Sequence, residues 1–150
     1  MNIFNWINKS CASLKGKRVA ISGSTGGLGK ELCHYLAHLN ADLILMDRNQ
    51  KKVLSLEKEL PQSHSGVNIT KIKLDLSDMG LVKSAVSELK PLSPDIIILN
   101  AGAYSIPRCK CNTGLDNVFQ INFASPYYIV KELLPTLKEK GGRIVAVGSI

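Results

Sequence analysis

Short apolar runs alternate with segments of helical periodicity along the chain. Strand-like runs lie at Lys17–Ser22, Leu43–Met46, Asn68–Leu74, Asp95–Leu99 and Arg143–Val147. Between them, apolar residues recur three or four positions apart, as on the buried face of a helix. Alternation of this kind is typical of βαβ units, and continuously apolar strands indicate a parallel sheet covered on both faces. The sequence therefore predicts an α/β fold with a doubly wound parallel sheet that stops after its fifth strand.

Four helices are expected between and after these strands. The predicted segments are Leu28–Leu39, a stripe of Val53, Leu56 and Leu60 ended by Pro61, a stripe from Leu81 to Leu89 closed by Pro91, and a long helix from about Leu115 to Lys140 with Pro126 as a candidate kink. Asn40 follows the first helix, and asparagine tolerates the left-handed conformation that ends helices. We find no linker or internal repeat, so residues 15–150 are predicted to form one domain.

Residues 1–14 precede this pattern as an N-terminal extension. Its apolar residues predict one face of a short helix, and they are Ile3, Phe4, Trp6 and Ile7. Such a face suits a membrane surface or the folded domain, and packing on the domain is the favoured interpretation. Asn5 and Asn8 interrupt the apolar run and the charges follow it, which is unlike a secretion signal.

Charge and cysteine content exclude several classes of function. The net charge is +7, but the lysines are scattered on helical stretches without interleaved arginines and aromatics, so no nucleic-acid partner is expected. No apolar run reaches the roughly 18 residues of a membrane span.

His34 and His38 have metal-ligand spacing but no third ligand, so both are placed on a solvated face and no metal is expected. The cysteines Cys11, Cys33, Cys109 and Cys111 show no disulfide framework, which favours reduced thiols and a cytoplasmic location.

A glycine-rich loop joins the first strand to the first predicted helix. Glycines let the backbone turn sharply and approach a ligand, and a helix N-terminus favours a pyrophosphate. The spacing is GxxxGxG, which matches neither GxGxxG nor a Walker loop, because Lys30 is followed by Glu31. The residues of this loop predicted to bind the cofactor are Gly23, Ser24, Thr25, Gly27, Leu28 and Gly29.

Asp47 ends the second strand, where a carboxylate accepts bonds from the ribose hydroxyls of a dinucleotide. A carboxylate repels a 2′-phosphate, which favours NAD over NADP. The adjacent Arg48 would instead attract that phosphate, so NADP remains an alternative.

Five motifs in order resemble the short-chain dehydrogenase/reductase family from about Lys15 onward. The loop SGSTGGLG is similar to the family's TGxxxGxG, with Ser22 in place of threonine. The other matching motifs are Asp75 and Leu76 in LDLSD, Asn100-Ala101-Gly102 in ILNAG, Asn122 in FQINF, and Ser149 after GGRIVAVG. The resemblance implies a Rossmann-type domain in which Asp75 contacts adenine, the Asn-Ala-Gly segment lies beside the cofactor ribose, and Asn122 and Ser149 are catalytic.

The family's Tyr-x-x-x-Lys motif, which follows the serine, does not occur after Ser149 in these 150 residues. Tyr127 and Lys131 have that spacing but precede Ser149, and we interpret them as helix-surface or dimer-contact positions. A fifth strand without a further neighbour would expose apolar surface.

The resemblance implies an NAD(P)-dependent oxidoreductase that transfers hydride between a nicotinamide cofactor and a carbonyl or alcohol, of which this chain carries the cofactor-binding half. It also implies a homo-oligomer for the full-length protein. The alternatives are a non-catalytic dinucleotide-binding module and an inactive gene remnant.

Overall fold

The computed structural model describes residues 3–63 and 66–148. Its elements, in chain order, are α1 (Ile3–Ser10), β1 (Arg18–Ser22), α2 (Gly27–His38), β2 (Asp42–Asp47), α3 (Gln50–Ser63), β3 (Ile69–Lys73), α4 (Met79–Leu92), β4 (Ile96–Leu99), α5 (Asn117–Phe119), the π-helical η1 (Gln120–Ala124), α6 (Ser125–Lys140) and β5 (Arg143–Ala146). The strands form one parallel sheet in the order β3-β2-β1-β4-β5. The predicted doubly wound α/β fold is confirmed.

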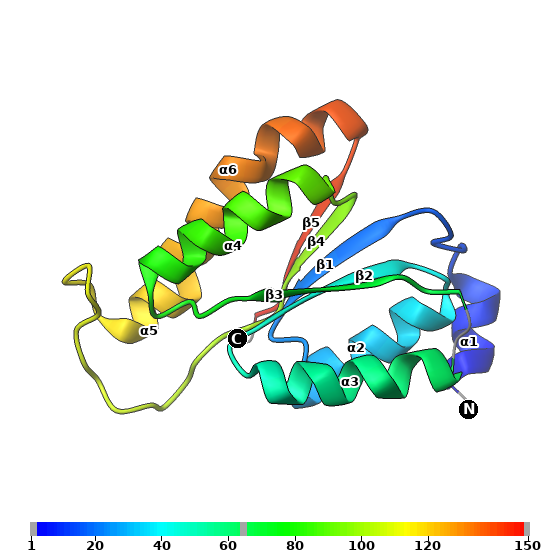
Figure 1. Cartoon of the computed structure of the whole chain (residues 1–150), viewed down its shortest axis with the longest axis horizontal. Coiled ribbons are helices and arrows are strands. Elements are labelled where there is room, and N and C mark those ends of the chain that lie inside the picture. The colour runs from blue at the N-terminus through cyan, green and yellow to red at the C-terminus, as the bar shows by residue number, and fades with distance from the viewer. Residues whose placement is uncertain (1–2, 64–65, 149–150) are drawn as a thin grey trace.

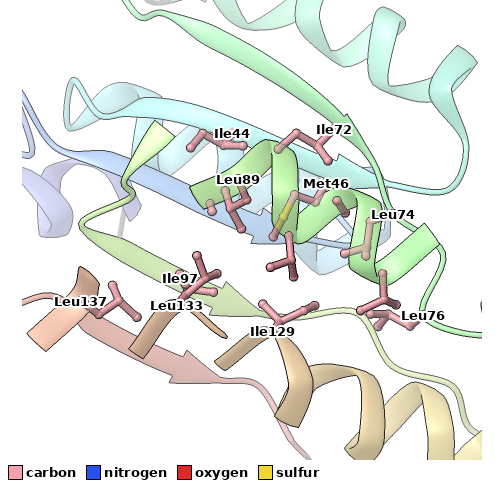
Figure 2. Packing of buried hydrophobic residues seen from close by; sticks show 14 residues of the cluster. Ile44, Met46, Ile72, Leu74, Leu76, Leu89, Ile97, Ile129, Leu133 and Leu137 are labelled. Atoms are coloured by element: carbon pink, nitrogen blue, oxygen red, sulfur yellow. The ribbon is translucent and has the colours of Figure 1, made fainter. Parts of the chain in front are cut away.

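Helices cover the two faces of the sheet in two layers, with α4 and α6 on one face and α2 and α3 on the other (Figure 1). Because successive strand residues point to opposite faces, β1 contributes Val19 and Ile21 to one core cluster and Ala20 to the other. Figure 2 shows strand residues such as Ile44 in the same cluster as Leu133 of α6. These two clusters hold the sheet rigid beneath the loops at its carboxyl end.

The chain reverses its direction of winding between β1 and β4. These two strands are direct neighbours, with Ile21 opposite Ile98, yet the loops that follow them lead to helices on opposite faces of the sheet. A crevice forms at such a point in open α/β sheets, and ligands bind there. The topology therefore places a candidate site beyond the carboxyl ends of β1 and β4.

The predicted helix ends at Pro61 and Pro91 are wrong. Helix α3 continues to Ser63, and α4 continues to Leu92 and is capped by Ser93, whose φ is +47°. A proline removes one backbone donor, and in the last turn of a helix this costs at most one intrahelical bond. The left-handed Asn40 after α2, with φ +65°, is as expected.

The predicted long helix from Leu115 to Lys140 is three consecutive segments, of which the middle one, η1, is a π-helix. At its end the Ser125 amide donates to the carbonyl oxygen of Gln120, five residues back. The next residue, Pro126, has no N–H to donate to Asn122, which favours an irregular turn at this point. Pro126 itself lies in the first turn of α6.

Strand β5 exposes apolar side chains, as the sequence predicted. All its residues are exposed, and Ile144 and Val145 retain 39% and 43% of their accessible surface. β5 pairs with β4 on one side. The described residues provide neither a helix nor a strand to cover its other side.

The N-terminal helix α1 packs onto α2 through two of its four apolar residues, which confirms the favoured interpretation for these two, while the other two residues of the predicted face remain exposed. Ile7 is buried, and the ring centroid of Phe4 lies 5.5 Å from that of Tyr35 and 4.9 Å from that of His38. The Nε2 atom of His38 also lies 2.7 Å from the side-chain oxygen of Asn8, so α1 partly covers the helix face on which the sequence places His38. Within the described ranges, no helix has the length and apolarity needed to cross a membrane.

Candidate functional site

A cavity of about 660 Å³ opens at the carboxyl end of the sheet, between the loops that follow β1 and β4. All predicted cofactor-binding residues except Ser24 line it. They are Gly23, Thr25, Gly27, Leu28, Gly29, Asp47, Arg48, Asp75, Leu76, Asn100, Ala101 and Gly102. Segments that follow four different strands therefore meet at one cavity.

The glycine loop turns where no larger residue fits. Gly23 has a φ of +66°, and a Cβ on it would lie 3.0 Å from Ala101. A Cβ on Gly29 would overlap the carbonyl oxygen of Gly23 and lie 2.8 Å from the side-chain nitrogen of Asn100. This packing lets α2 begin directly at the cavity, where the free amide groups of its first turn are available to a ligand.

Ser22 and Asn100 join the glycine loop to the loop after β4. The buried Ser22 hydroxyl oxygen accepts from the amides of Asn100 and Ala101, at 3.1 and 3.0 Å. The Asn100 side chain donates to the carbonyl oxygens of Ser22 and Gly23, both at 3.1 Å. These four bonds fix the two loops that form the floor of the cavity.

Asp47 lies at the cavity wall and is only 8% exposed. Its Oδ2 atom accepts from the amide and hydroxyl of Thr25, at 3.1 and 2.9 Å, and its Oδ1 atom accepts from the Asn49 amide at 3.0 Å. A carboxylate has about four acceptor positions. One position therefore remains for a ligand hydroxyl, while Arg48 and Lys52 supply positive charge on the same wall.

The loop after β3 is held by the irregular helix. Asp75 Oδ1 accepts from the amide and hydroxyl of Ser77, at 2.9 and 2.6 Å. The buried Gln120 side chain of η1 donates to the Ser77 carbonyl at 2.7 Å, and the Ser125 hydroxyl donates to the Leu76 carbonyl at the same distance. Asp75 and Leu76 are thereby fixed on the cavity wall.

Asn122 contacts the loop after β4 through both ends of its amide. Its oxygen accepts from the Ala103 amide and its nitrogen donates to the Ala103 carbonyl, each at 2.8 Å. Gly102 lies so close that a Cβ there would be 3.2 Å from the Asn122 oxygen. In this arrangement Asn122 positions the loop at the cavity. The other predicted catalytic residue, Ser149, lies outside the described residues.

Ser24 faces the interior rather than the cavity. Its side chain is fully buried, and its hydroxyl has no hydrogen-bond partner among the described residues. The Cys33 thiol points at the Ser24 carbonyl oxygen, 3.9 Å away, from the buried face of α2. The buried side chains of Ser24 and Cys33 therefore pack on the side of the glycine loop that faces away from the cavity.

We expect Cys33 to resist alkylation while the chain is folded. Burial, with a smaller contribution from the Asp47 carboxylate, raises the pKa of the Cys33 thiol to about 12. Thiol reactivity follows the thiolate, so at pH 8 iodoacetamide should modify Cys33 at least about a hundredfold more slowly than the exposed Cys109. Because the pKa of Cys33 is higher in the folded chain than in the unfolded chain, the thiol does not lower the stability of the fold below the unfolded pKa of about 8.5. Above that pH the stability of the fold decreases as the pH rises toward 12.

Peptide mass spectrometry after timed labelling provides the measurement. Urea-unfolded chain is the control, in which Cys33 and Cys109 should react at similar rates. Equal rates in the folded chain would show that Cys33 is accessible and would contradict its placement.

Several residues that line the cavity did not emerge from the sequence. They are Gly26, Asn49, Lys52, Leu74, Ala103, Tyr104, Ile106, Ile121 and Val147. Asn49 and Lys52 closely follow Asp47, so their position after the second strand was a usable signal. Tyr127 does not line the cavity; it is 59% exposed, and its ring stacks on Phe123 with 6.1 Å between centroids. This agrees with a helix-surface position for Tyr127.

Residues 17–150 match the family model described as short chain dehydrogenase. The chain is 34% identical to dehydrogenase/reductase SDR family member 7B of Mus musculus, over 95% of this chain and 46% of that protein. It is also 34% identical to the uncharacterized oxidoreductase YmfI of Bacillus subtilis, over 89% of this chain and 56% of that protein. The chain thus spans about half the length of these curated relatives.

Solved structures share the fold. An NADPH-dependent 3-quinuclidinone reductase from Rhodotorula rubra superposes with a TM-score of 0.76 and 26% identity, over 91% of this chain and 53% of that one. A 3-oxoacyl (acyl-carrier-protein) reductase from Agrobacterium tumefaciens with NADP bound has a TM-score of 0.77 and 23% identity, over 92% and 54%. The second likeness is evidence for the fold alone.

Proposed function

Because this chain belongs to the short-chain dehydrogenase family, we propose that its cavity binds a nicotinamide adenine dinucleotide. We further propose that the complete protein transfers hydride between this cofactor and a carbonyl or alcohol substrate. The observation that carries the proposal is the convergence on one cavity of the glycine loop, Asp47, Asp75 and the segment Asn100–Gly102. Each group suits a different part of a dinucleotide.

The residues of the cavity fit such a ligand in a definite order. The pyrophosphate suits the first turn of α2, since a Cβ at Gly27 would meet no protein atom within 4 Å and the backbone is open to a ligand there. Asp47 suits the adenosine ribose hydroxyls, and Asp75 suits the adenine edge. The segment Asn100–Gly102, held by Ser22, suits the nicotinamide ribose.

The cofactor, when bound, would supply or accept the hydride. Asn122 would keep the loop at Ala103 in place beside the reacting end of the cavity, through its two bonds of 2.8 Å. Ser149 would donate a hydrogen bond to the substrate oxygen. A tyrosine and lysine beyond this chain would complete proton transfer, as the family pattern implies.

We expect NAD to bind at least about tenfold more tightly than NADP, because a 2′-phosphate would meet the Asp47 carboxylate, and like charges in contact cost several kcal/mol. Two proteins of similar fold are described with NADP or NADPH, but the preference here follows from the residues of this chain. Titration of each dinucleotide into the chain, followed by isothermal calorimetry, measures the ratio of dissociation constants.

The matched variant for this prediction is Asp47→Asn, which keeps an acceptor for Thr25 and removes the charge. It should bring the two dissociation constants closer by raising NADP affinity. A preference for NADP in the parent chain, abolished by Arg48→Ala, would contradict the assignment to NAD. Absence of binding to either dinucleotide by a folded chain would overturn the proposed function, and binding without turnover by the complete protein would favour a non-catalytic module.

A further inference from the structure

The outward face of α1 carries apolar side chains that the rest of the described chain leaves exposed. Trp6 and Ile3 are 46% and 45% exposed, while Ile7 and Phe4 of the same helix pack against the domain. Residues three apart lie on one side of a helix, which places Lys9 on the same outward face as Trp6. The helix therefore presents a tryptophan and a lysine together to solvent, although its inward face already anchors it.

A basic hollow lies directly after α1, at the end of the sheet where the strands begin. Its volume is about 380 Å³, and Cys11, the residue that follows the helix, lines it. The charged residues of its lining are Lys17, Asp95, Lys140 and Arg143. The Asp95 carboxylate lies 3.5 Å from the Lys17 ammonium and 3.7 Å from that of Lys140, so its charge is shared between them. Positive charge is in excess at this hollow.

Positive charge continues from the hollow along the extension. Lys15 lies between the lining residues Leu14 and Lys17 and is exposed, as is Lys9 on α1. On α6, Lys138 and Glu139 are both exposed and offset each other. The net charge of +7 thus has a local concentration beside the exposed tryptophan.

We propose that this end of the molecule docks on an anionic phospholipid bilayer, with Trp6 and Ile3 at headgroup depth and the lysines against the lipid phosphates. Tryptophan is favoured at that depth because its ring is amphipathic. A short apolar face alone binds membranes weakly, and each nearby lysine adds attraction to anionic lipid. The excess of positive charge favours an anionic lipid surface over a neutral bilayer, and over an apolar partner that carries no acidic groups.

The docking surface lies at the opposite end of the sheet from the dinucleotide cavity. Figure 1 shows α1 where β1 and β2 begin, and the long loop after β4 at the other end. The cavity opens at the carboxyl ends of the strands. Docking through α1 would leave the cavity free to exchange its ligand with solvent.

The chain contains a single tryptophan, so the tryptophan fluorescence reports Trp6 alone. We expect vesicles of phosphatidylcholine with phosphatidylserine to shift the emission of the 150-residue chain to shorter wavelength, and high salt to reverse the shift. Bilayers with brominated acyl chains should quench the same emission. An unshifted spectrum with anionic vesicles, or an equal shift with pure phosphatidylcholine, would overturn the proposal.

Two charge reversals separate this surface from general basic attraction. Lys9→Glu should lower the partition coefficient for anionic vesicles by about fivefold or more, while Lys83→Glu on α4, also exposed, should leave it unchanged. Trp6→Ser should reduce co-sedimentation with the vesicles, and circular dichroism verifies that each variant is folded. Equal losses for Lys9→Glu and Lys83→Glu would contradict docking through α1. Dinucleotide affinity is measured separately and does not depend on this result.

Discussion

Replacing Gly29 with alanine is expected to destabilise the fold by about 3 kcal/mol, because the added methyl group has no space and must displace backbone. A Cβ at this position would overlap the Gly23 carbonyl oxygen and lie 2.8 Å from the Asn100 side-chain nitrogen. Both groups are held by the bonds between the two loops, so neither can move without breaking contacts at the cavity floor. Urea unfolding followed by circular dichroism gives the change in free energy.

Gly27→Ala is the matched control, since it makes the same chemical change two residues earlier. A Cβ on Gly27 would meet nothing within 4 Å, and Gly27 lies in the first turn of α2. Alanine favours helix over glycine by up to about 1 kcal/mol, so this variant should be as stable as the parent or slightly more stable. Equal stability of the two variants would contradict the close approach of α2 to the loop.

The strands and the glycine loop could be predicted because local sequence determines them. Apolar runs such as Leu43–Met46 fit a buried strand, and the structure extends that strand to Asp42–Asp47. The loop was recognisable because Gly23 and Gly29 stand where no side chain fits, whatever the rest of the fold. At such positions the residue type alone indicates the local structure.

The π-helical turn and the inward orientation of Ser24 could not be predicted, because both depend on distant contacts. The turn η1 is held through the Gln120 side chain, which bonds to carbonyl groups 43 and 44 residues away. Ser24 belongs to the loop motif, yet its side chain is fully buried, and the thiol of Cys33 in α2 contacts its carbonyl oxygen. Sequence spacing identifies a motif but does not tell which of its side chains face the ligand.

The helix ends near the prolines differ from the prediction for another reason. Pro61 and Pro91 were expected to end helices, and both lie inside the last turn instead. Near the end of a helix the missing donor costs little, and packing of the apolar stripe, with Leu89 fully buried in α4, outweighs it. Tertiary burial therefore decided the helix ends.

Ser22→Ala is expected to destabilise the chain by about 3 kcal/mol, since one hydroxyl oxygen accepts from two part-buried amides and an unpaired amide costs about 1–3 kcal/mol. The bonds that are lost are those from the Asn100 and Ala101 amides, at 3.1 and 3.0 Å. The loop after β4 would loosen, so amide hydrogen exchange of a peptide covering residues 98–103 should accelerate. Affinity for NAD should fall with it, because this loop forms part of the cavity.

Ser22→Thr is the control that isolates the hydroxyl. Threonine keeps the acceptor oxygen, and it is the usual residue at this position of the short-chain dehydrogenase loop. We expect its stability and its exchange rates to remain close to those of the parent chain. Unchanged protection of the Asn100 and Ala101 amides in Ser22→Ala would mean that other contacts hold the loop, and the Asn100 side chain, which donates to Ser22 and Gly23, would then be its main support.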